Sequence, residues 1–469
     1  MTTHAGNRAV DSAQELAEAA LAESAADGCV VVVEEHSETN LRWAANALTT
    51  NGQARTRSLT VISTFERADG ASAGVVTRAV TTAREVADLV HASEAAGRTA
   101  RPTSEASPLV EPYEHDDDWA AAAAETSAAV FEDLVPALGA AFGRWRREGR
   151  LLFGYAEHQM SSCFLATSTG LRRRFDQPDG RLELTGKSGD LTRATWSGAH
   201  VPDFAGVDVT TVAEALGQRL DQSPERVALP AGRYETILPP AAVADLMICA
   251  YQKASARDAD EGRNVYGAGG GSRIGERLST LPLTLRSDPA EPGLRCSPFA
   301  IITAPESGME SVFDNGQPVS AVPWISRGHL TDLVRTRSWA RHTGSRPRPR
   351  VGNLILDGGG DATLEQMIAT TERGLLLTSL WYVREVDPRT LLSTGLTRDG
   401  VYLVENGRIR GTVNNFRFNE SPTDLLGRLT EAGRSEHTLP RERSDRFRRT
   451  KMPAIRVPDF NMSTVSDAV

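Results

Sequence analysis

Residues 373–422 read RGLLLTSLWYVREVDPRTLLSTGLTRDGVYLVENGRIRGTVNNFRFNESP. Apolar and β-branched residues, which favour strands, gather in three segments, at 375–383, 400–404 and 408–418. Asn406-Gly407 lies between two of these segments and is a strong hairpin signal, because both residues tolerate positive φ angles. Asp399-Gly400 is expected to form a turn for the same reason. The stretch therefore predicts a sheet at the centre of the C-terminal half.

The N-terminal part of the chain also alternates between helical and strand patterns. We expect helices at 11–26 and 81–96, and strands at 29–35, 41–50, 55–65 and 73–80. Asn51-Gly52 is expected to turn the chain between two of these strands. Helices that flank antiparallel strands are typical of the α+β class. The sequence thus predicts an α+β fold with two domains and largely antiparallel sheets.

Length and local composition suggest where the domains begin and end. A chain of 469 residues is expected to hold two or three cores. We expect an N-terminal α+β domain at 1–230, with a Pro- and Ser-rich linker at 97–118 between its two parts. Within it, 119–150 has a helical pattern that Pro136 is expected to bend or divide. A sheet-rich domain is predicted at 231–440 and a basic tail at 441–469.

Charge and composition narrow the class of protein. A formal net charge of −9 disfavours a general nucleic-acid binder, and the basic clusters at 341–350 and 441–451 are expected to be solvated loops or partner-docking surface. No apolar run reaches the length of a membrane span, and the N-terminus lacks a secretory signal, so we expect a cytoplasmic protein with no membrane contact. The four cysteines form no C-x-x-C pair and are expected to be free thiols.

Several stretches along the chain are similar to motifs of the TldD/PmbA family. They are LRWAANALTTNGQARTRSLTVIST (41–64), the hairpin around FLATSTGL (164–171), EGRNVYGAGGGSRIGE (261–276) and STGLTRDGVYLVENGRIRGTVNNFRFNES (393–421). The similarity runs from about residue 12 to 430. It implies the two-domain architecture of that family.

The zinc-binding motif of the family has no counterpart here. TldD-type members carry H-E-x-x-x-H on a helix, in which two imidazoles hold zinc and the glutamate handles the proton of the attacking water. In this chain the corresponding helix includes LMICAYQK (246–253), and Ile248, Cys249 and Lys253 stand at about the motif positions. These three residues cannot supply the chemistry of the motif. The chain therefore resembles the TldE/PmbA-like members of the family. This resemblance implies that this chain holds no cofactor and that a partner subunit holds the zinc.

The resemblance implies a function as part of a pair. We expect a non-catalytic subunit of a heterodimeric zinc metalloprotease that degrades or processes small or unfolded peptides. Its partner would be a TldD-type subunit with H-E-x-x-x-H, and the two would enclose a chamber. Two alternatives stay open: an independently active metallopeptidase with atypical metal ligands, and a peptide-binding or interaction module without a protease role.

Six polar residues in family-like stretches are candidates for contact with a peptide channel or a partner, while no catalytic or metal-binding residue is predicted. The six are Glu261, Arg263, Thr397, Arg398, Asp399 and Asn415. Local explanations compete with this one. Glu261 and Arg263 are spaced for a salt bridge on a solvated face, and turn formation explains Asp399 without any ligand.

Overall fold

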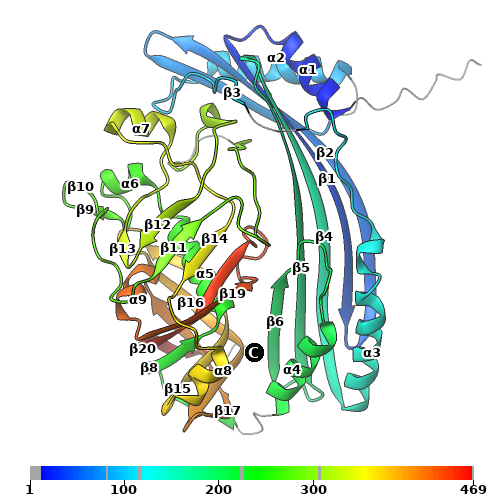
Figure 1. Cartoon of the computed structure of the whole chain (residues 1–469), viewed down its shortest axis with the longest axis vertical. Coiled ribbons are helices and arrows are strands. Elements are labelled where there is room, and N and C mark those ends of the chain that lie inside the picture. The colour runs from blue at the N-terminus through cyan, green and yellow to red at the C-terminus, as the bar shows by residue number, and fades with distance from the viewer. Residues whose placement is uncertain (1–11, 81–82, 115–117, 222–225, 305–307, 467–469) are drawn as a thin grey trace, which may run out of the picture.

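The computed structural model describes residues 12–80, 83–114, 118–221, 226–304 and 308–466. An elongated N-terminal sheet lies beside a more compact C-terminal part that holds a second large sheet (Figure 1). Both sheets are mostly antiparallel and carry helices, so the predicted α+β class is confirmed. In the described part of the chain, every helix is too short or too polar to cross a bilayer.

The N-terminal sheet has six strands in the order β3-β2-β1-β4-β5-β6. Their bounds are β1 (Gly28–Ala44), β2 (Ala47–Arg67), β3 (Gly70–Arg78), β4 (Arg150–Thr167), β5 (Arg172–Ser188) and β6 (Ala194–His200). Four of these strands, β1, β2, β4 and β5, run through 17 to 21 residues each, which gives the sheet its length.

The first hairpin of this sheet turns at a different place from the one predicted. The chain reverses at Ala45 and Asn46, both with positive φ, and the Asn46 side chain bonds the backbone of Arg150 and Leu152. Asn51-Gly52 instead lies inside β2, where Gly52 pairs with Asn40. The predicted strands at 41–50 and 55–65 are therefore parts of β1 and β2. Side-chain hydrogen bonds to a neighbouring strand fix the turn at Asn46, and no local pattern shows them.

Helices cover one face of the N-terminal sheet, with α1 and α2 at one end and α3 and α4 at the other (Figure 1). Their bounds are α1 (Ala13–Glu23), α2 (Ala83–Thr99), the 3-10 turn η1 (Ala128–Phe131), α3 (Leu134–Arg147) and α4 (Val209–Asp221). The helix predicted from residue 119 begins only at Leu134. Pro136 explains this start, because proline is tolerated in the first turn of a helix but not in its interior.

The opposite face of the sheet packs against the C-terminal part. Val30, Val32 and Leu165 share an apolar cluster with Phe299 and Phe313. Because successive side chains of a strand point to opposite faces, the helices contact the alternate residues Val31 and Val33. The sheet is therefore buried on both sides at this end.

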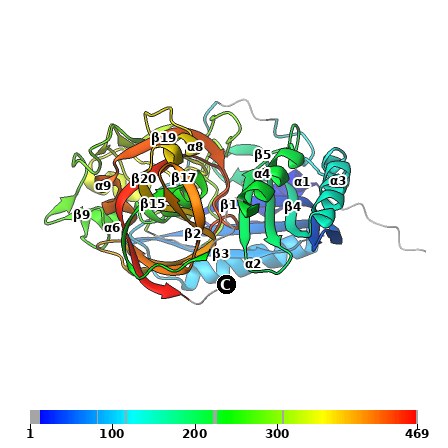
Figure 2. The same ribbon diagram turned by 90° about the horizontal axis from the view of Figure 1, so that it is seen from below.

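The second large sheet has twelve strands, and five of them pair in a closed ring, β20-β8-β15-β16-β18-β20. Figure 2 shows two of these strands, β15 and β20, among the curved strands of this part. The strands are β7 (Arg226–Val227), β8 (Gly232–Leu238), β11 (Thr284–Ser287), β12 (Val322–Ser326), β13 (His329–Leu330), β14 (Leu354–Asp357), β15 (Arg373–Asp387), β16 (Leu392–Glu405), β17 (Arg408–Val413), β18 (Asn415–Glu420), β19 (Glu431–Thr438) and β20 (Thr450–Ser466). Ring closure leaves these five strands with few free edges.

Helix α5 (Pro240–Tyr251) packs against strands of this ring and is buried along nearly its whole length. Apolar residues make up most of its surface and its surroundings, which is the pattern of a core helix. The other C-terminal elements are short. They are α6 (Ala256–Asp260), α7 (Arg337–Thr343), α8 (Leu364–Ala369), α9 (Pro422–Arg428), the 3-10 turn η2 (Val312–Asp314) and the separate pair β9 (Gly267–Ala268) and β10 (Gly271–Ser272).

The central stretch 373–422 forms strands as predicted, with two local differences. The Asn406-Gly407 hairpin is confirmed, since it joins β16 to β17 with both residues at positive φ. Asp399-Gly400 is also at positive φ but lies inside β16, where the register shifts as in a β-bulge. The segment predicted at 408–418 divides into β17 and β18, and β18 leaves β17 to pair with β20.

The region expected to be a basic tail is part of the C-terminal sheet. Residues 450–466 form β20, which pairs with β8, β14, β18 and β19. Met452, Ile455 and Phe460 on this strand are fully buried in the core. The boundary predicted at residue 440 thus differs from the structure, because the apolar positions after Lys451 supply a strand and the basic residues lie in the loop before it.

Arg441, in the loop between β19 and β20, connects the two parts of the molecule. Its guanidinium donates to Glu183 of β5 at 2.8 Å and to Asp399 of β16 at 3.4 Å. The same group lies over the rings of Trp196 and Trp381, 5.1 and 5.2 Å from their centroids. One side chain thus makes charge and aromatic contacts with both sheets.

The predicted linker also bridges the two parts. Glu105, which is buried, accepts hydrogen bonds from Thr336 at 2.6 Å and from Arg257 at 2.7 Å. Tyr113 donates to the carbonyl of Gly316. Polar residues of this segment therefore form hydrogen bonds with the C-terminal part.

We expect Arg441→Ala to lower the free energy of unfolding by about 2–4 kcal/mol, because it leaves two mostly buried carboxylates without this cation and removes both ring contacts. Chemical denaturation followed by fluorescence measures the change. Arg434→Ala is the control: the Arg434 side chain makes only a 3.5 Å surface pair with Glu436 among the described contacts, so we expect a change within about 0.5 kcal/mol. Equal effects of the two substitutions would contradict the bridging role.

Candidate functional site

Helix α5 carries a polar stripe on an otherwise apolar surface. Asp245 and Cys249 are four residues apart and face the loop between β19 and β20. The carboxylate of Asp245, which is fully buried, accepts hydrogen bonds from the backbone N–H groups of Arg441, Glu442 and Arg443, each at 3.1 Å. This buried acid therefore fixes the backbone of the loop.

Arg443 returns from the loop to the same face of α5. Its guanidinium donates to Sγ of Cys249 at 2.7 Å and to Oε1 of Gln252 at 3.0 Å. Burial raises the pKa of Asp245 to about 7 against the opposing effect of the three backbone N–H groups and Arg443. Burial likewise raises the pKa of Cys249 to about 11, although the guanidinium opposes the shift. The stripe thus combines an acid, a thiol and a cation within a mostly apolar region.

A cavity of about 570 Å³ opens beside this stripe. It is lined by the end of α5, by the strands β15 and β16, and by the loop before β20. The lining residues include Cys249, Lys253, Glu385, Ser393, Glu442 and Arg446. Lys253 and Glu385 form an ion pair at 2.9 Å. The cavity is therefore polar and charged, and it lies at the end of the helix that the sequence resemblance aligns with the zinc-motif helix.

Tyr382 comes directly before Val383 and Arg384, which line the cavity. It has a φ of 55°, a left-handed conformation that is uncommon for a non-glycine residue, and it sits in a bulge of β15. Its side chain is 57% exposed, and its backbone N–H donates to Glu442. The Arg384 guanidinium lies 4.3 Å from its ring centroid. A strained backbone here presents an aromatic ring beside the cavity.

Of the three motif positions expected from the sequence, Ile248 and Cys249 lie on α5, and Lys253 follows the end of this helix. Ile248 is fully buried in the core, whereas Cys249 and Lys253 line the cavity. The residues that face the loop at a four-residue spacing are Asp245 and Cys249, because each helical residue turns by about 100°. Within the described residues, no group of three or more His, Cys, Asp or Glu side chains could hold a metal ion.

Glu261 and Arg263 lie at the end of α6 in a local network of charges. Arg263 forms ion pairs with Glu261 and with Asp258, and Arg257 pairs with Glu261 at 3.2 Å. Glu261 borders a shallow pocket near Trp339. Neither residue lines the cavity beside α5.

The other four expected residues lie on β16 and β18. Thr397 is buried and joins the two strands, since its hydroxyl donates to Asn415 and accepts the N–H of Phe416. Arg398 lies over Trp381 at 5.0 Å, and Asp399 accepts the hydrogen bond of Arg441 described above. Asp399 is thus the one of the six that contacts the loop fixed by Asp245.

Asp245 and Arg443 were not expected from the sequence. One signal for Asp245 was present, because it is the single charged residue in the helix Pro240–Tyr251, and a charge in a core helix needs a partner. Its partners lie almost two hundred residues later in the chain. The sequence shows Arg443 only as one of many arginines in a basic cluster.

Comparisons with known proteins agree with this architecture. Residues 231–464 match the family model of the PmbA/TldA metallopeptidase C-terminal domain. A search of curated protein sequences finds no match. Among solved structures, TldE from Thermococcus kodakarensis superposes with a TM-score of 0.77 at 16% identity, covering 96% of this chain and 99% of that one.

Two bacterial structures are similar in the same way. A candidate modulator of a DNA gyrase from Thermotoga maritima gives a TM-score of 0.74 at 15% identity, covering 96% of this chain and 99% of its own. Another, from Bacteroides thetaiotaomicron, gives 0.73 at 14% identity, covering 97% and 98%. The C-terminal half carries the family's sequence pattern, and almost the whole chain has the fold. The chain belongs to the TldD/PmbA family.

Proposed function

We propose that this chain is the non-catalytic, TldE/PmbA-like subunit of a heterodimeric zinc metalloprotease that processes or degrades small or unfolded peptides. A TldD-type subunit with H-E-x-x-x-H would supply the zinc, and this chain would complete the chamber around it. The family match and the TldE-like fold support the proposal. The main structural support is the contact between the Arg443 guanidinium and Cys249 on α5.

The residues on this face do not fit a zinc ion. Asp245 and Cys249 have the donor atoms and the spacing of possible ligands. However, both carboxylate oxygens of Asp245 accept backbone N–H groups, and a guanidinium contacts Sγ of Cys249. A second cation beside Arg443 would be repelled, and the thiol has a raised pKa that disfavours the thiolate. The arginine thus contributes positive charge where the catalytic subunit would hold its metal.

The polar cavity beside α5 suits a supporting role in peptide handling. It is lined by charged side chains, and one of them, Arg384, contacts the exposed ring of Tyr382. Peptides bind well to strand edges and polar rims because main-chain hydrogen bonds do not depend on sequence. In a pair of related subunits, this wall would face the chamber.

The first test compares the chain alone with the chain plus a TldD-type partner from the same genome. We expect the isolated chain to hold less than stoichiometric zinc by elemental analysis and to cleave no unfolded peptide. With the partner we expect a 1:1 complex by light scattering and cleavage that a chelator abolishes. Stoichiometric zinc together with cleavage by the chain alone would reject the proposal in favour of an independent peptidase. Absence of any complex would favour a module without a protease role.

The second test measures how firmly Arg443 is held on α5. In a double-mutant cycle with Arg443→Met and Cys249→Ala, we expect a coupling energy of about 1–2 kcal/mol, because the 2.7 Å contact lies in a poorly solvated region. Chemical denaturation of the four proteins gives the value. The matched cycle uses Lys253→Met and Glu385→Gln, whose ion pair is more exposed, and should give less than about 0.5 kcal/mol. Coupling no larger than in this control would show that the guanidinium is not fixed there.

A further inference from the structure

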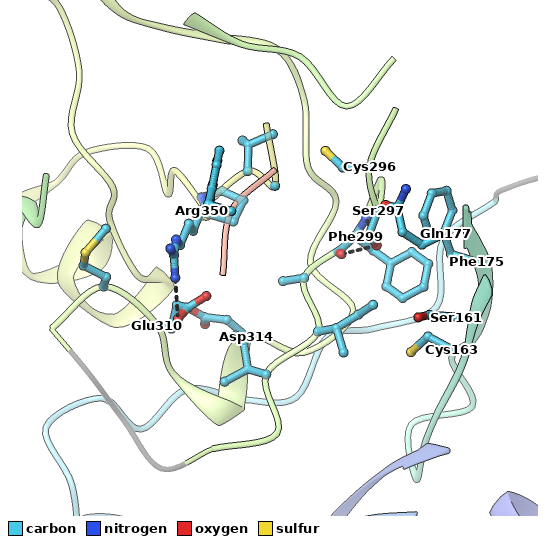
Figure 3. A pocket seen from close by; sticks show the side chains of 18 of the residues that line it. Ser161, Cys163, Phe175, Gln177, Cys296, Ser297, Phe299, Glu310, Asp314 and Arg350 are labelled. Atoms are coloured by element: carbon cyan, nitrogen blue, oxygen red, sulfur yellow. Dashed lines mark hydrogen bonds and ion pairs between the residues drawn. The ribbon is translucent and has the colours of Figure 1, made fainter. Parts of the chain in front are cut away.

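A second cavity, of about 380 Å³, lies between the N-terminal sheet and the C-terminal part (Figure 3). One wall is the sheet itself. Glu34 of β1 pairs with Cys163 of β4, which pairs with Phe175 of β5, so these three side chains point to the same face. The next row is His36, Ser161 and Gln177. The ring of His36 hydrogen-bonds Ser161 at 2.8 Å.

The C-terminal part supplies the facing wall. Figure 3 shows Arg350 and Glu310 across the cavity from Ser161, Cys163 and Phe175. Arg350 and Glu310 form a loose ion pair at 3.6 Å. Arg446, from the loop before β20, lines this cavity as well as the one beside α5. The two cavities thus share one arginine.

Apolar side chains make up part of the cavity lining. Phe299 and Ile302 of the C-terminal part line the cavity together with Phe175. The ring of Phe299 lies at the same side as Phe175 in Figure 3. The lining is therefore mixed, with apolar side chains and a few polar groups, and the volume is within the range of small-molecule sites.

Two charges of opposite sign in this lining have no partner among the described residues. The carboxylate of Glu34 accepts no hydrogen bond and forms no ion pair there, and the guanidinium of Arg446 likewise has none. By contrast, three other charged residues of the lining are paired: Asp314 with Arg337, Arg335 with Asp332, and Arg449 with Asp179. The unpaired carboxylate of Glu34 thus lies on the sheet wall, and the unpaired guanidinium of Arg446 belongs to the C-terminal part.

We propose that this cavity binds short peptides by their two free termini. Glu34 would receive the α-ammonium group, and Arg446 with Arg350 would receive the terminal carboxylate by charge-assisted hydrogen bonds. An apolar side chain of the peptide would pack against Phe175, Phe299 and Ile302, while His36 and Gln177 can bond its main chain. The inference deepens the proposed function, because it names peptides of product size as ligands of this subunit, and it requires neither metal nor partner.

Isothermal titration calorimetry on the full chain tests the inference with three probes: tri-leucine, N-acetyl tri-leucine and tri-leucine amide. We expect tri-leucine to bind and each capped form to bind at least about tenfold more weakly, since each cap removes one terminal charge. Capped forms that bind as well as tri-leucine, or no detectable binding of tri-leucine, would overturn the inference. Because the partner is absent, these outcomes are independent of complex formation and cleavage.

Substitutions assign each terminus to its residue. Glu34→Gln should weaken binding of tri-leucine but leave that of N-acetyl tri-leucine unchanged, and Arg446→Gln should weaken tri-leucine but leave the amide unchanged. Glu38→Gln is the matched control, because Glu38 lies on the same face of β1 four residues on, bonds Asn40, and is outside the cavity lining. Thermal unfolding checks that each variant is folded. Equal loss for all three probes in a folded variant would overturn the assignment of that terminus.

Discussion

The buried carboxylate of Asp245 is the constraint on which the arrangement of the loop before β20 depends. A carboxylate in a core helix is costly unless hydrogen bonds satisfy it, and here three consecutive backbone N–H groups do so. Since the backbone at 441–443 is fixed, Arg441 and Arg443 leave it in defined directions. Arg441 contacts Glu183 of the N-terminal sheet, and Arg443 contacts Cys249 of α5. The contact between the two parts and the polar contacts on α5 therefore both depend on Asp245.

The arginines of this loop are used inside the molecule. Arg448 pairs with Glu157 at 2.7 Å and Arg449 with Asp179 at 2.6 Å, both on the N-terminal sheet. His200, Arg449 and Arg448 together outweigh burial and lower the pKa of Asp179 to about 2. Arg446 differs from these residues, because it lines both cavities without a described partner. A cluster that is expected from the sequence to be a docking surface mostly makes contacts inside the molecule, and Arg446 is the exception.

The sequence was informative where contacts are local. The Asn406-Gly407 hairpin and the apolar segments around it depend on neighbouring residues, so the C-terminal sheet could be predicted. Asp399-Gly400 has the backbone angles of a turn but forms a bulge, because β15 continues to pair on both sides of it. The turn at Ala45-Asn46 depends on bonds from Asn46 to β4, about a hundred residues away. The local sequence therefore does not show whether a residue pair that tolerates positive φ forms a hairpin turn or a bulge.

The candidate site was harder to predict for the same reason. The resemblance drew attention to Cys249 and Lys253 only as motif positions, whereas Asp245 and Arg443 could be recognised only once the loop was seen against α5. Thr397 and Asn415 stand out as polar residues in a family-like stretch, yet they bond each other between two strands. No local sequence pattern points to Glu34, because its proposed role depends on the C-terminal residues across the cavity.

The ring of five strands also bears on how the chain folds. β8 pairs with β20, so Leu238 must find Ile455 after almost the whole C-terminal part has been made. Such distant pairing is slow, since the entropy of a long loop is lost before the contact forms. Until then β8 and β18 each present an open edge, and α5 lacks part of its cover. Nascent chains of this protein are therefore most exposed to aggregation just before the final strand arrives.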